Sequence, residues 1–438
     1  MKKYIILVIS FVIFFSIQAQ TCLTDSLNTT EHNQPHKKFG IGGTPILAFD
    51  SDLGLKYGVV LNLFHYGDKF PKYLQYIKIK ALQTTNGTSN LSLTYDNNIL
   101  FKKTKFIFES TYTKDVLLNF YGFNGINSNY YTTVTTPDNT DYINPYYYTH
   151  QRQLLRFRLD FQKQIQSTKM YFLYGFSFNK YMLDPTDFSL FDTPLGSNQN
   201  ELSTSTLYQD YINSNIITEQ EREGGTFASL KLGVTYDSRN NQINCSDGIF
   251  LETYLIFSPM LTNLKSFSKH IITFRHYYML KKIKTLLTYR ISSQQKINGT
   301  IPFYYLPTFH DLTIDNDGIG GAFNLRGVSR NRIAANGFIT ANFEVRKKVV
   351  SFKALKQDCR IELSAFTDLA YITQKYKFET NMDNDSYYNS KKQNINYTYG
   401  LGLYFIYGTN NIISINYGVS PNKNLGNSGL YIGSAFLF

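Results

Sequence analysis

The stretch Leu155-Arg156-Phe157-Arg158-Leu159-Asp160-Phe161 alternates strictly between apolar and charged side chains. Because successive side chains of a β-strand point to opposite faces, four apolar residues share one face and three charged residues share the other. This pattern is typical of a strand in a membrane β-barrel, where one face contacts lipid and the other faces a wet interior. Soluble sandwiches alternate too, but their strands are usually shorter, about 5–6 residues. The stretch therefore favours an all-β transmembrane barrel.

The same alternation recurs along the chain, for example in Tyr76–Ala81 and Leu91–Tyr95. Sixteen strands are predicted, at 39–49, 53–66, 73–86, 88–97, 104–117, 150–163, 169–182, 226–237, 247–258, 268–280, 284–295, 335–347, 358–373, 395–407, 411–418 and 429–438. An even number of strands places the N-terminus and the C-terminus of the barrel on the periplasmic side. The long connections 118–149, 183–225, 296–334 and 374–394 then all fall on the extracellular side, as barrels of this kind require. Residues 39–438 are predicted to form a 16-stranded antiparallel transmembrane β-barrel.

The N-terminus has the features of an export signal. Lys2 and Lys3 precede an apolar run from Tyr4 to Ile17, and Ala19 follows as a small residue. This order predicts a signal peptide over residues 1–19. Residues 20–38 are polar and aperiodic, which predicts a short disordered periplasmic leader. No later segment has the ~20 consecutive apolar residues of a membrane-spanning helix, so the exported chain is either soluble or a membrane β-barrel. The strand alternation favours the barrel and therefore the cell outer membrane.

The composition agrees with a barrel. The chain has 36 Tyr and 35 Phe, which would supply aromatic girdles at both membrane interfaces in the absence of Trp. The net charge is +12, and the basic residues are scattered over predicted strands and turns. We interpret them as a cationic lumen and as turns that meet anionic outer-membrane lipid. Nucleic-acid binding is not predicted, because no basic helix or base-stacking platform is apparent.

No motif for catalysis, a metal or a cofactor is present. The chain has no His-Glu-x-x-His, Gly-x-Ser-x-Gly or phosphate-binding loop. The pair His310-Asp311 is interpreted as a plain polar pair. Asp315-Asn316-Asp317-Gly318 lacks the later bidentate Glu of a calcium loop. We therefore predict a protein that is not an enzyme and that has no cofactor.

A glycine-rich segment, Gly318-IGGAFNLRGVSRNRI-Ala334, lies between two strand patterns. Gly318, Gly320 and Gly321 permit backbone conformations that other residues resist, so the segment can fold back on itself. Arg326 would then present a fixed charge and five hydrogen-bond donors at the tip. An ordinary hairpin loop with a solvated Arg would fit the same residues.

Glycines followed by Leu325-Arg326-Gly327 resemble the sixth extracellular loop of the BamA/TamA outer-membrane assembly-factor superfamily, which folds into the barrel lumen. The loop also joins the eleventh and twelfth predicted strands, its place in that superfamily. Further segments similar to the family are Gly233–Ile249 with its Asp-x-Arg pair, Asn342–Arg346, Ala365–Ala370 and the opening hairpin from Pro45 to Gly54. Two positions depart from the family pattern: Cys245 replaces a usual Pro, and Leu369-Ala370 replaces a usual small pair.

Strand parity suggests partners for Arg326. In the twelfth strand Glu344 is expected to face the lumen, and in the thirteenth strand Asp368 is expected to do the same. Two carboxylates on neighbouring strands make a fork that one Arg can bridge. We hypothesise that Arg326 and Gly327 of the infolded loop, with Glu344 and Asp368, form a lumen-loop lock. The alternative is that each charge is solvated separately.

The C-terminus, Tyr431-x-Gly433-x-x-Phe436-x-Phe438, resembles the signal by which outer-membrane barrels are recognised for insertion. The first predicted strand contains Gly40, Gly42, Gly43 and Pro45, and the last contains Gly429 and Gly433. Because glycine and proline weaken strand pairing, the closing seam is a candidate lateral opening. The alternative is that the glycines in the first and last strands only let the barrel close at the right curvature.

The resemblance implies a role in outer-membrane protein insertion or polypeptide translocation. Residues 20–38 are too few for the family's periplasmic polypeptide-transport-associated domains, so a member lacking them is expected. Other assembly proteins or lipoproteins would then be its partners, and unfolded barrels its substrates. The alternatives are a passive or plugged channel, a structural subunit of an outer-membrane complex, or an adhesin that uses the loops 118–149 and 183–225.

Overall fold

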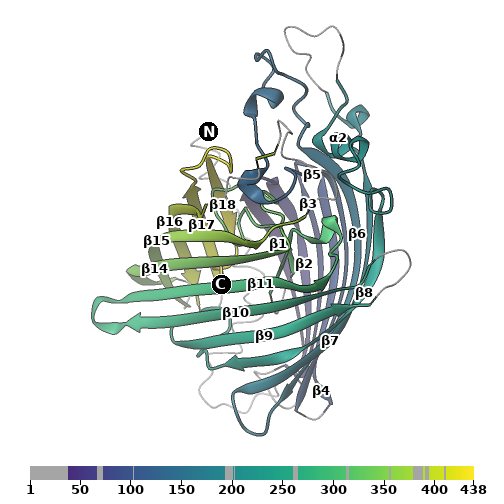
Figure 1. Ribbon diagram of the computed structural model, residues 1–438. Helices are drawn as coiled ribbons and strands as arrows, with labels where there is room; N and C mark the ends of the chain where they lie inside the picture. The colour runs from purple at the N-terminus through teal and green to yellow at the C-terminus, as the bar shows by residue number, and fades with distance from the viewer. Residues whose placement is uncertain are drawn as a thin grey trace, which may run out of the picture.

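The chain forms one closed barrel of antiparallel strands in the computed structural model (Figure 1). The structure describes residues 38–66, 73–101, 103–192, 201, 203–259, 265–311, 315–354, 357–377, 388–389, 394–408 and 411–438. The predicted signal peptide 1–19 and all of the predicted leader except Lys38 lie outside the described residues. These two predictions therefore stay predictions.

All sixteen predicted strands are present in the barrel wall. They are β1 (Phe39–Asp50), β2 (Gly54–His65), β3 (Gln75–Thr84), β4 (Thr88–Phe101), β5 (Thr104–Asn119), β6 (Thr149–Gln164), β7 (Met170–Asp184), β8 (Gly224–Asp237), β9 (Gly248–Ser258), β10 (Phe267–Leu280), β11 (Thr285–Gly299), β14 (Gly337–Ala354), β15 (Gln357–Gln374), β16 (Asn396–Tyr407), β17 (Asn411–Val419) and β18 (Ser428–Gly433). Each strand pairs with its neighbours in chain order, and β1 closes the barrel against β18.

The largest differences from the predicted bounds occur at two strand ends. β14 continues to Ala354 instead of ending at 347, because a bulge between Lys348 and Val350 lets its pairing with β15 carry on past the lysines that interrupt the alternation. β18 ends at Gly433, although the last strand was predicted to reach 438. The last five residues leave the wall, and their aromatic side chains contact residues of the lumen.

The two faces of the wall follow the predicted parity. On β14, Ile339, Phe343 and Val345 are exposed on the outer face, whereas Asn342 and Glu344 are buried inside the barrel. The polar inner face is not an open channel in its extracellular half, because the connection between β11 and β14 occupies it. That connection carries a separate two-stranded ribbon, β12 (Thr308–His310) with β13 (Asp315–Asp317).

The extracellular loops pack into an aromatic cap. Buried rings from different loops meet there, including Phe120, Phe123, Tyr208 and Phe303. The short elements of the cap are η1 (Gly125–Asn127), η2 (Thr132–Thr135), η3 (Phe188–Leu190), α2 (Leu207–Asn213) and η5 (Phe303–Tyr305), and the turn after β10 forms η4 (Lys281–Ile283). α2 stands at the upper right of Figure 1. Among the described residues, no helix is long and apolar enough to cross a membrane.

Candidate functional site in the lumen

The glycine-rich segment folds back on itself inside the barrel. Gly318, Gly320 and Gly321 adopt φ values of 59°, 118° and 80°, a region that residues with a Cβ rarely enter. Asn324 fixes the turn, since its side chain accepts from the N–H of Gly320 at 2.7 Å and donates to the carbonyl of Gly318 at 2.7 Å. Apolar packing then holds the segment in place, because Leu325 and its apolar neighbours belong to a buried hydrophobic cluster.

Arg326 reaches the wall at β15. Its Nε donates to Oδ2 of Asp368 at 2.9 Å, its Nη2 donates to Oδ1 at 3.0 Å, and its backbone N–H donates to Oδ2 at 3.1 Å. Nη1 donates to Asn416 at 3.2 Å, and the guanidinium lies 3.3 Å from the ring centroid of Phe366. Both charged side chains are 1% exposed or less. This is a bidentate pair with well-formed geometry, which offsets the cost of burying the charges.

Glu344 also lies close to Arg326 but does not hydrogen-bond to it. Its Oε2 lies 3.8 Å from Nη1 of Arg326, beyond hydrogen-bond distance, and accepts from Nη2 of Arg346 at 3.2 Å. The hydroxyl of Tyr404 donates to its other oxygen at 2.5 Å. The predicted fork is therefore asymmetric: Asp368 binds Arg326 directly, and Glu344 mainly serves Arg346.

A second anchor lies on the other arm of the loop, and the sequence interpretation missed it. Asp311 forms an ion pair with Arg275 on β10. Arg290 on β11 lies nearby, and its Nη2 donates to the carbonyl of Phe323 at 2.7 Å. Asp311 was interpreted as half of a plain polar pair with His310. The alternation along β10 does indicate that Arg275 points into the lumen. Only the path of the loop through the lumen shows that Asp311 lies beside it.

The loop also contacts both flanks of the barrel seam. On the β18 side, the N–H of Gly327 donates to the hydroxyl of Tyr431 at 3.0 Å. On the β1 side, the N–H of Arg330 donates to Oδ1 of Asp52, in the turn after β1, at 3.0 Å. Burial, together with the neighbouring charge of Asp50, raises the pKa of Asp52 to about 7. One short piece of the loop thus touches the first and the last strand regions.

Arg332 joins the loop to the cap. Nε donates to the carbonyl of Asn424 at 2.8 Å, Nη1 to that of Gly125 at 2.8 Å, and Nη2 to that of Ser128 at 2.7 Å. Its side chain is almost fully buried. The guanidinium of Arg332 therefore links its own loop to two other loops that are far away in the sequence.

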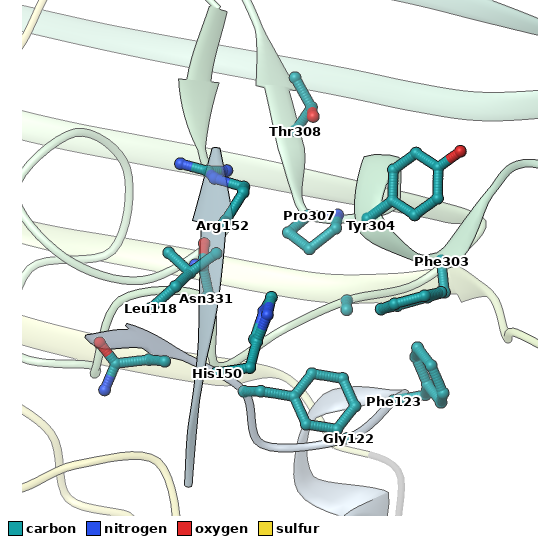
Figure 2. Close-up of a pocket in the computed structure, with 13 residues that line it drawn as sticks. Leu118, Gly122, Phe123, His150, Arg152, Phe303, Tyr304, Pro307, Thr308 and Asn331 are labelled. Atoms are coloured by element: carbon teal, nitrogen blue, oxygen red, sulfur yellow. The ribbon is translucent and has the colours of Figure 1, made fainter. Parts of the chain in front are cut away.

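A small cavity lies between the cap and the loop (Figure 2). His150 and Arg152 of β6 line it together with Phe303 and Asn331, and its volume is about 30 Å³. That space suits one or two water molecules but not a substrate. Among the side chains that the structure describes, no group of three or more His, Cys, Asp or Glu is placed to hold a metal ion.

The seam itself is short. β1 pairs with β2 along its whole length, from Phe39 to Asp50, but with β18 only at Phe49 and Asp50. Pro45 takes its regular place opposite Val59 on the β2 side. The pairing with β18 stops close to the end of that strand at Gly433. The periplasmic part of the β1 edge therefore has no register partner in β18.

Comparison with known proteins agrees with this architecture. A family model described as the Omp85 superfamily domain matches residues 75–434. No curated protein matches the chain. A solved structure of BamA from Haemophilus ducreyi lacking POTRA domains 1-3 is 13% identical, with a TM-score of 0.56 over 92% of this chain and 71% of that one.

CdiB from Escherichia coli is 10% identical, with a TM-score of 0.55 over 92% of this chain and 64% of that chain. At these identities the two solved structures support the fold alone, whereas the family model spans most of the barrel. The chain is an outer-membrane β-barrel that belongs to the Omp85 superfamily.

Proposed function

We propose that this barrel, exported by residues 1–19, takes part in inserting outer-membrane proteins or translocating polypeptides. Its substrates would be unfolded barrel proteins, and its partners other outer-membrane assembly proteins or lipoproteins. The observation that carries the proposal is the seam, where β1 pairs with β18 only at Phe49 and Asp50. Each missing pair removes ladder hydrogen bonds that would resist separation of the two strands.

The geometry supports a seam that opens from the periplasmic side. β1 starts at the periplasmic rim with Phe39, while β18 pairs with it only near the extracellular rim. The free part of the β1 edge offers unpaired backbone groups, which are a template for pairing with another strand. An incoming barrel strand could use that template before it leaves sideways into lipid.

Insertion by the reconstituted protein tests this proposal. The variant Phe49→Cys/Ile432→Cys places a disulfide across the seam, because these residues are register partners. We expect the oxidised variant to lose its ability to accelerate the insertion of an unfolded barrel into proteoliposomes, and reduction to restore it.

The matched control is Ile415→Cys/Ile432→Cys, which crosslinks β17 to β18 and leaves the seam free. It should insert normally when oxidised. Equal activity of the oxidised seam variant and its reduced form would count against lateral opening. Failure of the wild-type protein to accelerate insertion, alone and with outer-membrane extract, would count against the assembly role itself.

A second candidate is a plugged channel. The lumen loop and the aromatic cap fill the extracellular half, and the cavity between them is only about 30 Å³. Conductance in planar bilayers separates the two functions. A plugged channel should conduct steadily once Arg326→Ala frees the loop, whereas an assembly factor has no need to do so.

A further inference from the structure

One edge of β14 extends past its neighbour in the wall. The register of β14 with β11 ends at Lys347, whereas its register with β15 continues to Ala354. One more bond follows on the β11 side, from the N–H of Lys348 to the carbonyl of Lys284 at 3.2 Å. Within the described part of the chain, residues 349–354 have no partner strand on that side. We call this stretch the β14 edge; the end of β14 lies at the left of Figure 1.

Both faces of this segment are exposed, unlike those of the barrel wall. Farther up β14 the lumen residues Asn342 and Glu344 are buried, but from Lys347 to Lys353 every residue is exposed. A strand segment without a buried inner face has passed the rim of the lumen. Its free N–H and C=O groups need water or another partner, since hydrocarbon supplies none. The β14 edge therefore lies outside the hydrocarbon layer, at the rim of the short turns, which is the periplasmic rim in barrels of this kind.

The surface around the β14 edge is both basic and apolar. Asp358, the register partner of Lys353, offsets part of the positive charge. Along the edge itself Val349, Val350 and Phe352 are 54%, 45% and 42% exposed. This surface suits a partner that carries both carboxylates and aliphatic side chains. Six exposed lysines lie on the segment or on the turn after β10, and none of them forms an ion pair within the described part of the chain: Lys281, Lys282, Lys284, Lys347, Lys348 and Lys353.

An unpaired strand edge and a set of lysines together favour one kind of partner. A free edge is a template for another strand, and in strand addition the main-chain bonds supply affinity while alternate side chains supply specificity. Lysines on an edge discourage pairing with most strands, whereas carboxylates placed opposite them attract. An anionic lipid would neutralise the lysines but cannot continue a hydrogen-bond ladder. The β14 edge therefore favours a strand over a lipid headgroup.

We propose that the β14 edge binds an acidic β-strand of a periplasmic protein, which adds to the sheet beside β14. Carboxylates of that strand meet the lysines, and its aliphatic side chains pack on the exposed apolar residues of the edge. The site is separate from the seam, since β15, β16, β17 and β18 lie between β14 and β1. The inference goes beyond the proposed function, because a plugged channel would hold a periplasmic partner by the same edge.

The test uses the full chain in phosphatidylcholine nanodiscs and a fluorescein-labelled peptide, Glu-Val-Glu-Val-Glu-Val-Glu, at physiological salt. The variant Lys348→Glu/Lys353→Glu should bind the peptide at least about ten-fold more weakly, because it places like charges opposite each other. The matched control is Lys163→Glu/Lys169→Glu, which makes the same change at exposed lysines beside the turn between β6 and β7. It should retain the wild-type affinity, since distant charges are screened. An equal loss in both variants would contradict the proposal.

Hydrogen–deuterium exchange shows whether the peptide pairs with the backbone. Binding should slow exchange at least about ten-fold at those amides of residues 349–354 that face away from β15, since they become hydrogen-bonded. The peptide Glu-Pro-Glu-Pro-Glu-Pro-Glu has the same charge but lacks the N–H groups that a strand needs. It should bind weakly and leave exchange unchanged. If it binds as tightly as the valine peptide, or if the valine peptide does not slow exchange at 349–354, the proposal is wrong.

Anionic lipid is the alternative occupant of the β14 edge. In nanodiscs that contain phosphatidylglycerol the valine peptide should still bind. Protection of residues 349–354 by this lipid alone, with loss of peptide binding, would identify a lipid site and overturn the proposal. The assay requires no insertion activity. Peptide binding without insertion would therefore count against the proposed function alone, and insertion without peptide binding would count against this site alone.

Discussion

The backbone N–H of Arg330 donates a hydrogen bond to Oδ1 of Asp52 at 3.0 Å, although 278 positions separate the two residues. The bond ties the lumen loop to the turn that follows the first strand. Burial of the Asp52 carboxylate and the charge of Asp50 raise its pKa from 3.8 to about 7. The folded protein therefore binds a proton at Asp52 that the unfolded chain has already released.

The first prediction concerns pH. Between about pH 4 and 7 the folded state holds this proton and the unfolded state does not. The stability that the bound proton contributes is therefore lost as the pH rises from about 4 through 7. Asp52→Asn keeps an oxygen acceptor for Arg330 and removes the charge. We expect it to raise the heat-modification midpoint on gels at pH 8 and to raise it clearly less at pH 5. Asp138→Asn, at an exposed loop carboxylate, should have no effect at either pH.

The second prediction concerns Arg326 and the proposed lock. Arg326→Ala leaves the buried carboxylate of Asp368 without its main partner, so it should cost about 3–5 kcal/mol of unfolding free energy. Limited proteolysis should then cut the loop. Arg222→Ala is the control, because that Arg is 42% exposed and pairs with an exposed Glu219; it should cost less than about 1 kcal/mol. A wild-type melting point and protease resistance in Arg326→Ala would mean that no lock exists.

The third prediction concerns Gly327, which has a φ of 96°. A Cβ at this position would lie 2.8 Å from the backbone of Gly418 on β17. Gly327→Ala should therefore destabilise the barrel by more than the ~1–3 kcal/mol of backbone strain alone. Gly43→Ala is a matched control in the wall, since its Cβ would meet nothing within 4 Å. Urea unfolding in detergent compares the two, and equal midpoints would contradict the close approach.

The fourth prediction concerns the second anchor, Arg275 with Asp311. Residues in one buried ion pair are energetically coupled, so the double variant Arg275→Ala/Asp311→Ala should be more stable than the sum of the two single changes predicts, by about 0.5–3 kcal/mol. A cycle that combines Asp311→Ala with the distant Arg222→Ala should be additive. An additive cycle for Arg275 and Asp311 would show that the contact contributes nothing.

Much of the wall could be predicted from the sequence because its signal is local. Alternation identifies each strand and its lipid face, so the inward positions of Glu344 and Asp368 followed from parity alone. The position of Arg326 beside them came from a family resemblance. The lock and the lateral opening remain hypotheses that the experiments above address.

Other features depend on where distant segments meet. The alternation near the C-terminus does not show that the chain leaves the wall at Gly433, because Phe436 suits a lipid face as well as it suits the guanidinium of Arg346. Arg332 has no local signal, since its three partners are backbone carbonyls of other loops. Asp311 looked like a loop residue until the path of the loop was known.

The contact between Gly327 and Tyr431 has a consequence for the order of assembly. Gly327 donates to a side chain 104 positions later, on the strand that completes the wall, and Arg326 is enclosed by residues of β15 and β17. The partners of this loop are therefore complete only when the last two strands have joined the wall. These contacts can form only late in folding, after almost the whole chain has been placed.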